Sequence, residues 1–297
     1  MPLRLAITAF FLLSGATALV YQVVWARLLA NHLGSTTEGH TLVIATFMGG
    51  LGLGYAWLGR VSDRSKRPLR LYAYLEAGIA LWALCVPSLI DAGSQLLGGT
   101  WLLALVVVAV PTTLMGGTLP ALTAAMAARE RPGPTIALLY GVNALGAALG
   151  VFVAGFWMIE ALGVSRSGTL AAGINGVLAL LALVISRREE RDIHERRGAH
   201  SPGPLVRWAC LAACVIGFVS MAIQGAWIRF FGVVLGSSSY SFSLVIGVYI
   251  LGMALGSLFV RVILVRWAAL HLAIPLLAAL AVLSGCVLWL SAPGFSA

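Results

Sequence analysis

The sequence has few charged residues for its length, and this shortage excludes a soluble globular protein. Charged residues make up 10% of the 297 residues and apolar residues 60%, whereas soluble domains are about 25% charged and about 45–50% apolar. A helix that crosses a bilayer needs about 20 mainly apolar residues, and it satisfies its own backbone groups. We therefore predict an all-α polytopic membrane protein with nine transmembrane helices, at about residues 6–30, 38–59, 69–90, 100–127, 135–160, 165–186, 206–233, 240–264 and 267–291.

Cysteine and histidine are scarce as well, and their placement argues against a metal centre or a disulfide framework. Cys85, Cys210, Cys214 and Cys286 lie inside the apolar runs, without a CxxC spacing or a histidine at ligand spacing. We predict that they are buried free thiols. The sequence also has no Ser-His-Asp arrangement and no strand-like alternation, so we expect no catalytic residue, no metal and no cofactor.

The net charge of +9 indicates an orientation in the membrane rather than a nucleic-acid partner. Arg and Lys alternate between successive inter-helix segments, and sixteen of the nineteen fall on one predicted side. The positive-inside rule assigns that side to the cytoplasm. The N-terminus is then cytoplasmic and, after nine helices, the end of this chain lies outside. Arg27, Arg166 and Arg229 are the exceptions.

Residues 15–64 form an internal repeat with residues 217–266, which lie 202 residues later. Without gaps, positions 15–64 and 217–266 share fourteen identities, among them Gln, Trp and Arg inside the apolar runs. An offset of six helices preserves orientation, which predicts two parallel repeats related by an axis along the membrane normal. We therefore divide the chain into a first half of six helices (1–186), a basic cytoplasmic linker (187–206) and an incomplete second half of three helices (207–297).

The glycine-rich stretch Gly49–Gly54 fits helix packing better than nucleotide binding. A dinucleotide fingerprint follows a strand and opens a helix, whereas these glycines lie late in an apolar helix. Gly50 and Gly54 share one helix face, as do the matching Gly252 and Gly256. Small residues at this spacing let helix backbones approach closely, so we predict two packing faces.

The loop GRVSDRSKR resembles the cytoplasmic G-x-x-x-D-R-x-x-R/K motif that joins the second and third helices of major-facilitator proteins. Its motif positions are Gly59, Asp63, Arg64 and Arg67. The resemblance implies that Asp and Arg side chains brace helix ends on the inner side. It also implies a major-facilitator-like fold.

Five further segments, in order, are similar to the membrane half of bacterial fused spermidine synthase-like proteins. They are LSGATALVYQVVWARLL, LGST, PLRLYAYLEAGIALWAL, PTTLMGGTLPALTAA and LYGVNALGAALGVFVAGF. This resemblance covers residues 5–290 and implies a bacterial inner-membrane location, with the end of this chain in the periplasm. It also implies a polyamine-related small molecule and a soluble aminopropyltransferase-like domain, fused or separate. No segment of these residues has the pattern of that domain, so we do not expect this chain alone to transfer an aminopropyl group.

Polar and aromatic residues inside the helices are the candidate ligand or coupling residues. Tyr21, Gln22 and Trp25 share one helix face, which suits a cation such as a polyamine. Arg27 points about 200° away from Trp25 and suits an anion or reaches the outer headgroups. Only one of these faces can line a cavity, and the sequence leaves both open. The repeat places Gln224, Trp227 and Arg229 at the matching positions.

Glu76 is a further candidate because it lies about seven residues into its predicted helix. An ionisable residue there costs about 2.5–3.5 kcal/mol on insertion scales and indicates function. We interpret Glu76 as a proton-coupling carboxylate or an amine ligand, with a salt bridge or hydrogen bond to the nearby Arg-rich loop as the structural alternative. Asn143 and Asn175 are predicted interhelical hydrogen-bonding residues. Pro111 and Pro120 predict a break or a kink in residues 100–127.

Two classes of function fit these patterns. The chain is either the membrane module of a spermidine synthase-like protein that transports or senses a polyamine-related molecule, or a non-transporting anchor in a larger complex. Its partners are then the lipid bilayer and a synthase-like domain, with no nucleic acid. Replacement of Gln22, Gln224 or Glu76 should impair a transporter and leave a scaffold intact.

Overall fold

The described part of the chain is a bundle of long helices. The computed structural model describes residues 2–33, 36–97, 101–127, 132–187, 204–234 and 238–266. Within these ranges, eight helices are long and apolar enough to cross a membrane, so the multi-span helical prediction is confirmed. The ninth predicted helix (267–291) lies outside the described residues, as does most of the linker. The elements are α1 (Pro2–Leu33), α2 (Thr36–Arg64), α3 (Pro68–Leu97), α4 (Trp101–Ala127), α5 (Pro132–Val153), η1 (Ala154–Met158), α6 (Ile159–Leu162), α7 (Val164–Ser186), α8 (Pro204–Val234) and α9 (Ser238–Arg266).

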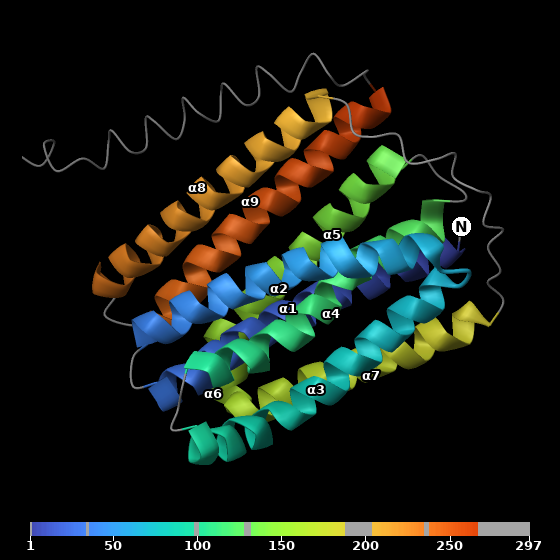
Figure 1. The fold of residues 1–297 in the computed structure, drawn as a ribbon. Helices are drawn as coiled ribbons and strands as arrows, with labels where there is room; N and C mark the ends of the chain where they lie inside the picture. Colours follow the sequence, from blue (N-terminus) through green and yellow to red (C-terminus); the bar gives the residue numbers. More distant parts are fainter. Residues whose placement is uncertain are drawn as a thin grey trace, which may run out of the picture.

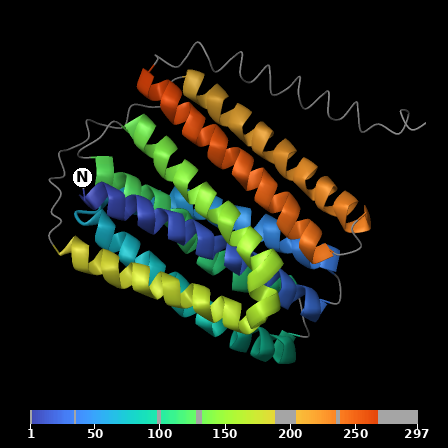
Figure 2. The ribbon, with the colours of Figure 1, turned by 180° about the vertical axis from the view of Figure 1, so that it is seen from behind.

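The helices lie side by side with their axes along one common direction (Figures 1 and 2). α3 and α7 pack against each other at one edge of the bundle, and α1 lies inside, against α5, α2 and α7. α9 packs on α5, and α8 packs on α9 at the opposite edge. The first residues of α1 and α3 and the last residues of α7 lie at the same end of the bundle (Figure 1).

Small residues let α2 and α4 approach closely. A Cβ atom added to Gly50 would overlap the Thr112 side chain, and one added to Gly54 would overlap the backbone of Thr113 and Gly116. The predicted packing face of Gly50 and Gly54 is therefore confirmed. In a membrane, where lipid tails are as apolar as the side chains, this close fit is a main source of helix association.

Proline does not break α4, so of the two predicted alternatives the break is wrong and the kink stays a prediction. The helix runs from Trp101 to Ala127 with Pro111 and Pro120 inside it. Pro111 lacks the N–H that would bond the Val107 carbonyl one turn earlier. The Trp82 Nε1–H of α3 donates to that carbonyl instead, at 3.0 Å. A side chain from the neighbouring helix thus satisfies the acceptor that proline leaves open.

The C-terminal end of α5 leads through two short elements into α7. A single π-helical turn, η1, follows α5, and the short α6 then ends at Gly163, whose φ of 78° suits glycine. At this turn the Phe156 ring lies 5.6 Å from the Tyr240 ring of α9. The Tyr240 hydroxyl also donates a hydrogen bond to the Glu160 carboxylate. These contacts join the turn between α5 and α7 to the start of α9, which no sequence pattern indicated.

The two segments that match at an offset of 202 residues are helical in both copies. The first parts of the two copies belong to α1 and α8, and the second parts to α2 and α9. The symmetry relation between the two halves stays a prediction.

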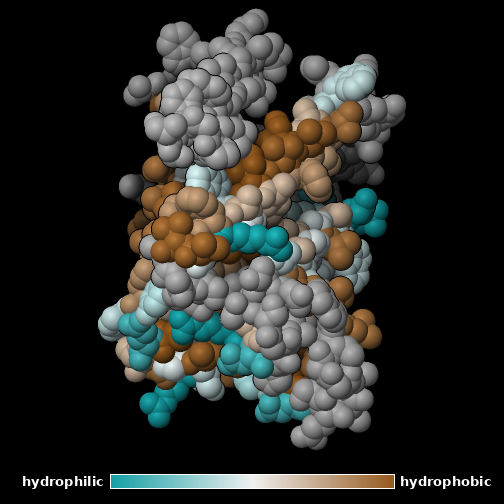
Figure 3. All heavy atoms as spheres, turned by 90° about the vertical axis from the view of Figure 1, so that its left-hand side faces the viewer, coloured by the Kyte–Doolittle hydropathy of each residue, from teal (hydrophilic) through white to brown (hydrophobic). Residues whose placement is uncertain are grey.

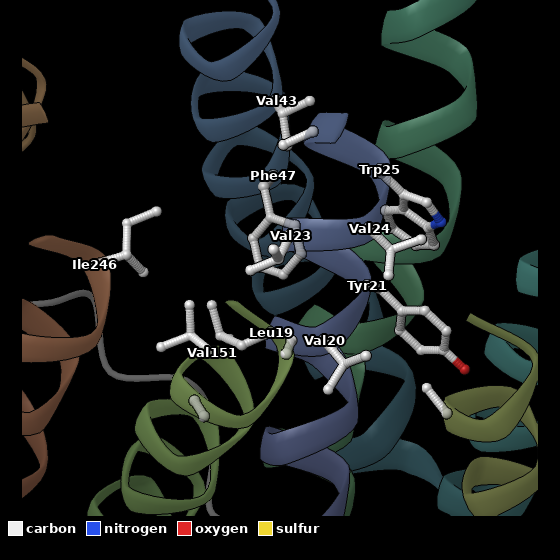
Figure 4. Packing of buried hydrophobic residues seen from close by; sticks show 14 of the residues in the cluster. Leu19, Val20, Tyr21, Val23, Val24, Trp25, Val43, Phe47, Val151 and Ile246 are labelled. Atoms are coloured by element: carbon white, nitrogen blue, oxygen red, sulfur yellow. The ribbon is translucent and has the colours of Figure 1, made fainter. Parts of the chain in front are cut away.

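Large apolar side chains fill the interior in two clusters. The larger cluster gathers residues of α1, α2, α5 and α9, among them Val23, Phe47, Val151 and Ile246 (Figure 4). The second lies toward the end of the bundle that holds the first residues of α1, and it includes Phe11, Leu69 and Leu122. The two clusters hold α1 at the centre of the first six-helix segment.

The flanks of the bundle are apolar, as a lipid-facing surface requires. Large apolar side chains are exposed on the helix faces, among them Leu81, Val177 and Phe218. Figure 3 views the end where α8 finishes and α9 begins, where hydrophobic groups lie beside several hydrophilic ones. Cys85, Cys210 and Cys214 are free thiols on exposed flanks, so the prediction that they are buried is wrong. They lie on helix faces that no neighbouring described helix covers. Cys286 lies outside the described residues.

Candidate functional site

A buried carboxyl group joins three helices of the first segment. Glu76 of α3 is 0% exposed. Its Oε1 accepts a hydrogen bond of 2.6 Å from Ser14 Oγ of α1, and its Oε2 accepts one of 2.6 Å from Asn175 Nδ2 of α7. The hydroxyl of Tyr72, one turn earlier on α3, hydrogen-bonds to the same carboxyl. All these partners are neutral side chains, so the predicted alternative of a salt bridge or hydrogen bond to the Arg-rich loop is wrong.

An aromatic pair extends this polar cluster along α1. The Tyr21 hydroxyl lies 3.5 Å from Asn175 Oδ1 and donates to it. The Tyr21 and Trp25 rings are stacked, with centroids 5.1 Å apart and planes 12° from parallel. Figure 4 shows both side chains on one side of α1, with the Tyr21 hydroxyl directed toward α7. The hydrogen bonds and the ring stack thus form a continuous path from Glu76 through Asn175 to Trp25.

The two predicted asparagines link helices as expected. Asn175 bridges Glu76 and Tyr21 across α7, α3 and α1. Asn143 of α5 donates from Nδ2 to the Phe11 carbonyl of α1 at 3.0 Å. Both predictions of interhelical hydrogen bonds are confirmed. Sequence analysis missed Ser14 and Tyr72 as partners of Glu76, although Tyr72 lies four residues before Glu76 on the same helix face.

Unpaired polar atoms mark a second set of candidate residues. Gln22 is 1% exposed and Gln224 is 4% exposed. Within the described ranges, each has a buried Oε1 atom that accepts no hydrogen bond, and the buried Nε atom of Arg27 donates none. A buried polar group without a partner costs about 1–3 kcal/mol, so such groups require an explanation. A ligand with N–H donors would satisfy the glutamine oxygens, and one with acceptors would satisfy Arg27.

The other matched candidates differ between the two copies. Trp25 is buried, whereas Trp227 is half-buried and packs against Phe230 and Phe231 on its own helix. Arg27 is half-buried and Arg229 is exposed. The described residues therefore do not present the two arginines in equivalent surroundings.

The motif GRVSDRSKR spans the last turns of α2 and the short connection to α3. Gly59 packs near the ring of Pro120 in α4, and Asp63 and Arg64 are exposed. The loop is held by hydrogen bonds from the Ser65 N–H to the Ser62 carbonyl (3.2 Å) and from the Arg67 N–H to Ser65 Oγ (3.3 Å). The bracing role of Asp63 and Arg64 stays a prediction.

Chemistry that needs a metal cluster has no support in the described part of the chain. No group of three or more His, Cys, Asp or Glu side chains there is placed to hold a metal ion. The polar groups that helices α1, α3 and α7 bring together are a carboxyl, hydroxyls, an amide and an aromatic pair. Such groups can bind a small polar molecule or a proton.

Eight membrane-length helices within the described ranges, a polar cluster in the bundle interior and apolar outer faces define a membrane transporter-like module. The family model of the Major Facilitator Superfamily matches residues 5–297, and the chain belongs to this family. No curated protein matches the chain.

Proposed function

We propose that this chain is the membrane module of a spermidine synthase-like protein and that it transports or senses a polyamine-related amine. The observation that carries this proposal is the pair of buried glutamine oxygens, Gln22 Oε1 and Gln224 Oε1, which lack a donor. They occur at positions 202 residues apart that match in the repeat. An amine brings N–H donors, which are what unpaired carbonyl oxygens need.

The surroundings of Gln22 also suit a cation. Tyr21 and Trp25 are adjacent to it on α1 and present stacked aromatic rings, and aromatic faces attract ammonium groups. Glu76, which reaches Tyr21 through Asn175, supplies a carboxyl group that can compensate a positive charge. The five segments similar to spermidine synthase-like proteins point to the same class of molecule.

The orientation and partners belong to the same proposal. By the positive-inside rule we assign the N-terminus to the cytoplasm of a bacterium and the end of this chain to the periplasm. An aminopropyltransferase-like domain, fused or separate, would then supply or consume the amine. Purification of the protein from its native membrane, with intact-mass measurement and identification of co-purifying proteins, tests this link. A lone chain of 31.1 kDa without a synthase-like partner would contradict it.

Transport is tested with the full chain in liposomes. We expect accumulation of labelled spermidine above that of protein-free liposomes, with competition by diamines and none by inorganic phosphate. Gln22→Leu should weaken amine binding about tenfold, because one hydrogen bond to a charged donor is lost. Thr169→Val is the matched control, since Thr169 is exposed and bonds only within α7. Uptake of an anion instead of an amine would overturn the assignment and favour the Arg27 face.

A scaffold is the second candidate function. It is favoured by the partners of Glu76, which all come from α1, α3 and α7 and thus tie one half of the bundle together. Glu76→Gln preserves most of these hydrogen bonds, whereas Glu76→Leu leaves Ser14 and Asn175 without their acceptor. We expect Glu76→Leu to lower the free energy of unfolding by about 1–3 kcal/mol more than Glu76→Gln. Normal folding of the unmodified chain and of Glu76→Gln, Gln22→Leu and Gln224→Leu, with no amine uptake above that of protein-free liposomes in any of them, would establish the scaffold.

A further inference from the structure

A basic cavity lies at the end of the bundle where α3 begins and α7 ends. Its volume is about 170 Å³, and its lining residues are Arg67, Arg70, Leu183, Ser186 and Arg187. α3 and α7 pack along each other, and Figures 1 and 2 show the start of α3 beside the end of α7. The cavity thus has two walls that are fixed by helix packing.

Three guanidinium groups dominate the charge of this cavity. Arg70 and Arg187 are exposed and Arg67 is half-buried, while the other two lining residues are neutral. Arg70 Nε donates to Tyr74 Oη at 2.8 Å, and its guanidinium lies 5.6 Å from the centre of the Tyr74 ring. This contact fixes the orientation of the Arg70 guanidinium and leaves its two Nη groups for another acceptor.

The backbone around the cavity favours an anion at one wall. The first turn of α3 is closed by the Arg67 carbonyl, which accepts from the N–H groups of Arg70 and Leu71 at 3.1 Å. The start of a helix carries partial positive charge. The end of α7 carries partial negative charge on the opposite wall, but Ser186 Oγ donates to the Leu183 carbonyl and the Arg187 N–H to the Val184 carbonyl. The side-chain charges therefore decide the sign of the site.

We propose that this cavity binds a phosphate group at the cytoplasmic face of the membrane. Guanidinium groups bind phosphate oxygens through paired N–H donors, and three of them line one cavity. A cavity needs about 10–15 Å³ to hold one water molecule, so a volume of about 170 Å³ leaves room for a phosphate group. The Arg-rich side is the cytoplasmic side by charge distribution, and basic cavities between helices on that side bind anionic lipid headgroups. The phosphate group belongs to an anionic phospholipid or to a soluble phosphate compound.

Lipid binding is tested with the full chain purified in a non-ionic detergent. Native mass spectrometry would measure retention of phosphatidylglycerol after exchange from vesicles of equal parts phosphatidylcholine and phosphatidylglycerol. We expect the double variant Arg70→Gln/Arg187→Gln to retain phosphatidylglycerol about tenfold less strongly than the unmodified chain. Arg60→Gln is the matched control, because it removes one exposed arginine at the same end of the bundle outside the cavity. Arg60→Gln should change the retention of phosphatidylglycerol by about twofold at most.

Soluble phosphate is tested in a second arm. Inorganic phosphate is titrated into the detergent-solubilised chain, with sodium chloride at matched ionic strength as the reference, and the thermal unfolding midpoint is followed. A saturable rise in the midpoint that the double variant weakens identifies a soluble phosphate compound. Phosphatidylglycerol retention without that rise identifies the lipid headgroup.

Two outcomes would overturn the proposed phosphate site. One is the absence of binding in both arms. The other is an equal loss of binding in Arg60→Gln and in the double variant, which would mean general attraction between charges. If the double variant does not fold, Arg70→Lys and the single variant Arg187→Gln replace it. Arg70→Lys keeps the charge but removes paired donation, so unchanged phosphate binding in both replacements would also contradict the proposal.

Discussion

The paired helices α1–α2 and α8–α9 share their sequence pattern but not their surroundings. In α1, 44% of the residues in the apolar stretch are buried, whereas in α8 the share is 6%. α1 lies among α2, α5 and α7, whereas α9 is the main neighbour of α8. The same sequence pattern therefore gives a central helix in one place and an edge helix in the other.

Glycine shows the difference at single positions. Gly50 and Gly54 press against α4, while no described atom lies within 4 Å of a Cβ added to the matching Gly252 or Gly256. Small residues on a helix face create the possibility of close packing, and a neighbouring helix is needed to realise it. A repeated motif thus fixes the local helical structure, while the neighbouring helices decide how much the motif contributes to stability.

Replacement of the matched tryptophans should give the largest difference in the free energy of unfolding between the two copies. Trp25 is 1% exposed, so Trp25→Ala should lower the free energy of unfolding by about 3–5 kcal/mol through the cavity that it creates. Trp227→Ala should cost about 1 kcal/mol, because Trp227 is only half-buried. Unfolding by dodecyl sulfate in mixed micelles, followed by circular dichroism, measures both. Equal losses would mean that α8 is covered as fully as α1.

Glycine replacement should give an intermediate effect. Gly54→Val should lower the free energy of unfolding by about 1–3 kcal/mol, because the added carbons meet the backbone of α4. Gly256→Val should change it by about 0.5 kcal/mol or less. The same unfolding measurement compares the pair. If Gly256→Val lowered the free energy of unfolding as much as Gly54→Val, a helix would have to pack on that face of α9.

Replacement of the matched arginines should change the free energy of unfolding least, and in the first copy it should raise stability rather than lower it. Arg27→Met removes a buried Nε that has no acceptor within the described residues, so the free energy of unfolding should rise by about 1 kcal/mol. Arg229→Met should leave it within about 0.5 kcal/mol, because Arg229 is exposed. A loss of stability for Arg27→Met would show that the Arg27 guanidinium has a partner in the folded protein.

Part of the candidate site was predictable from the sequence. Glu76 stood out because a carboxyl inside an apolar helix is costly, and Asn175 because an amide there needs a partner. Their pairing was not predictable, since Ser14 and Asn175 lie 62 and 99 residues from Glu76 along the chain. The nearby Arg-rich loop was the obvious partner by sequence distance. Helix packing instead directs Glu76 toward α1 and α7.

The sequence by itself determined the helices, their boundaries and their membrane character. Apolar runs of sufficient length, bounded by polar or charged segments, must satisfy their backbone hydrogen bonds internally, and this requirement acts within each segment. Only the tertiary structure decided that Trp25 is buried while Trp227 is half-buried, that Trp82 bonds the Val107 carbonyl, and that three arginines share one cavity. These outcomes depend on which helix lies alongside, because burial, packing and charge proximity are properties of pairs of segments and not of one segment alone.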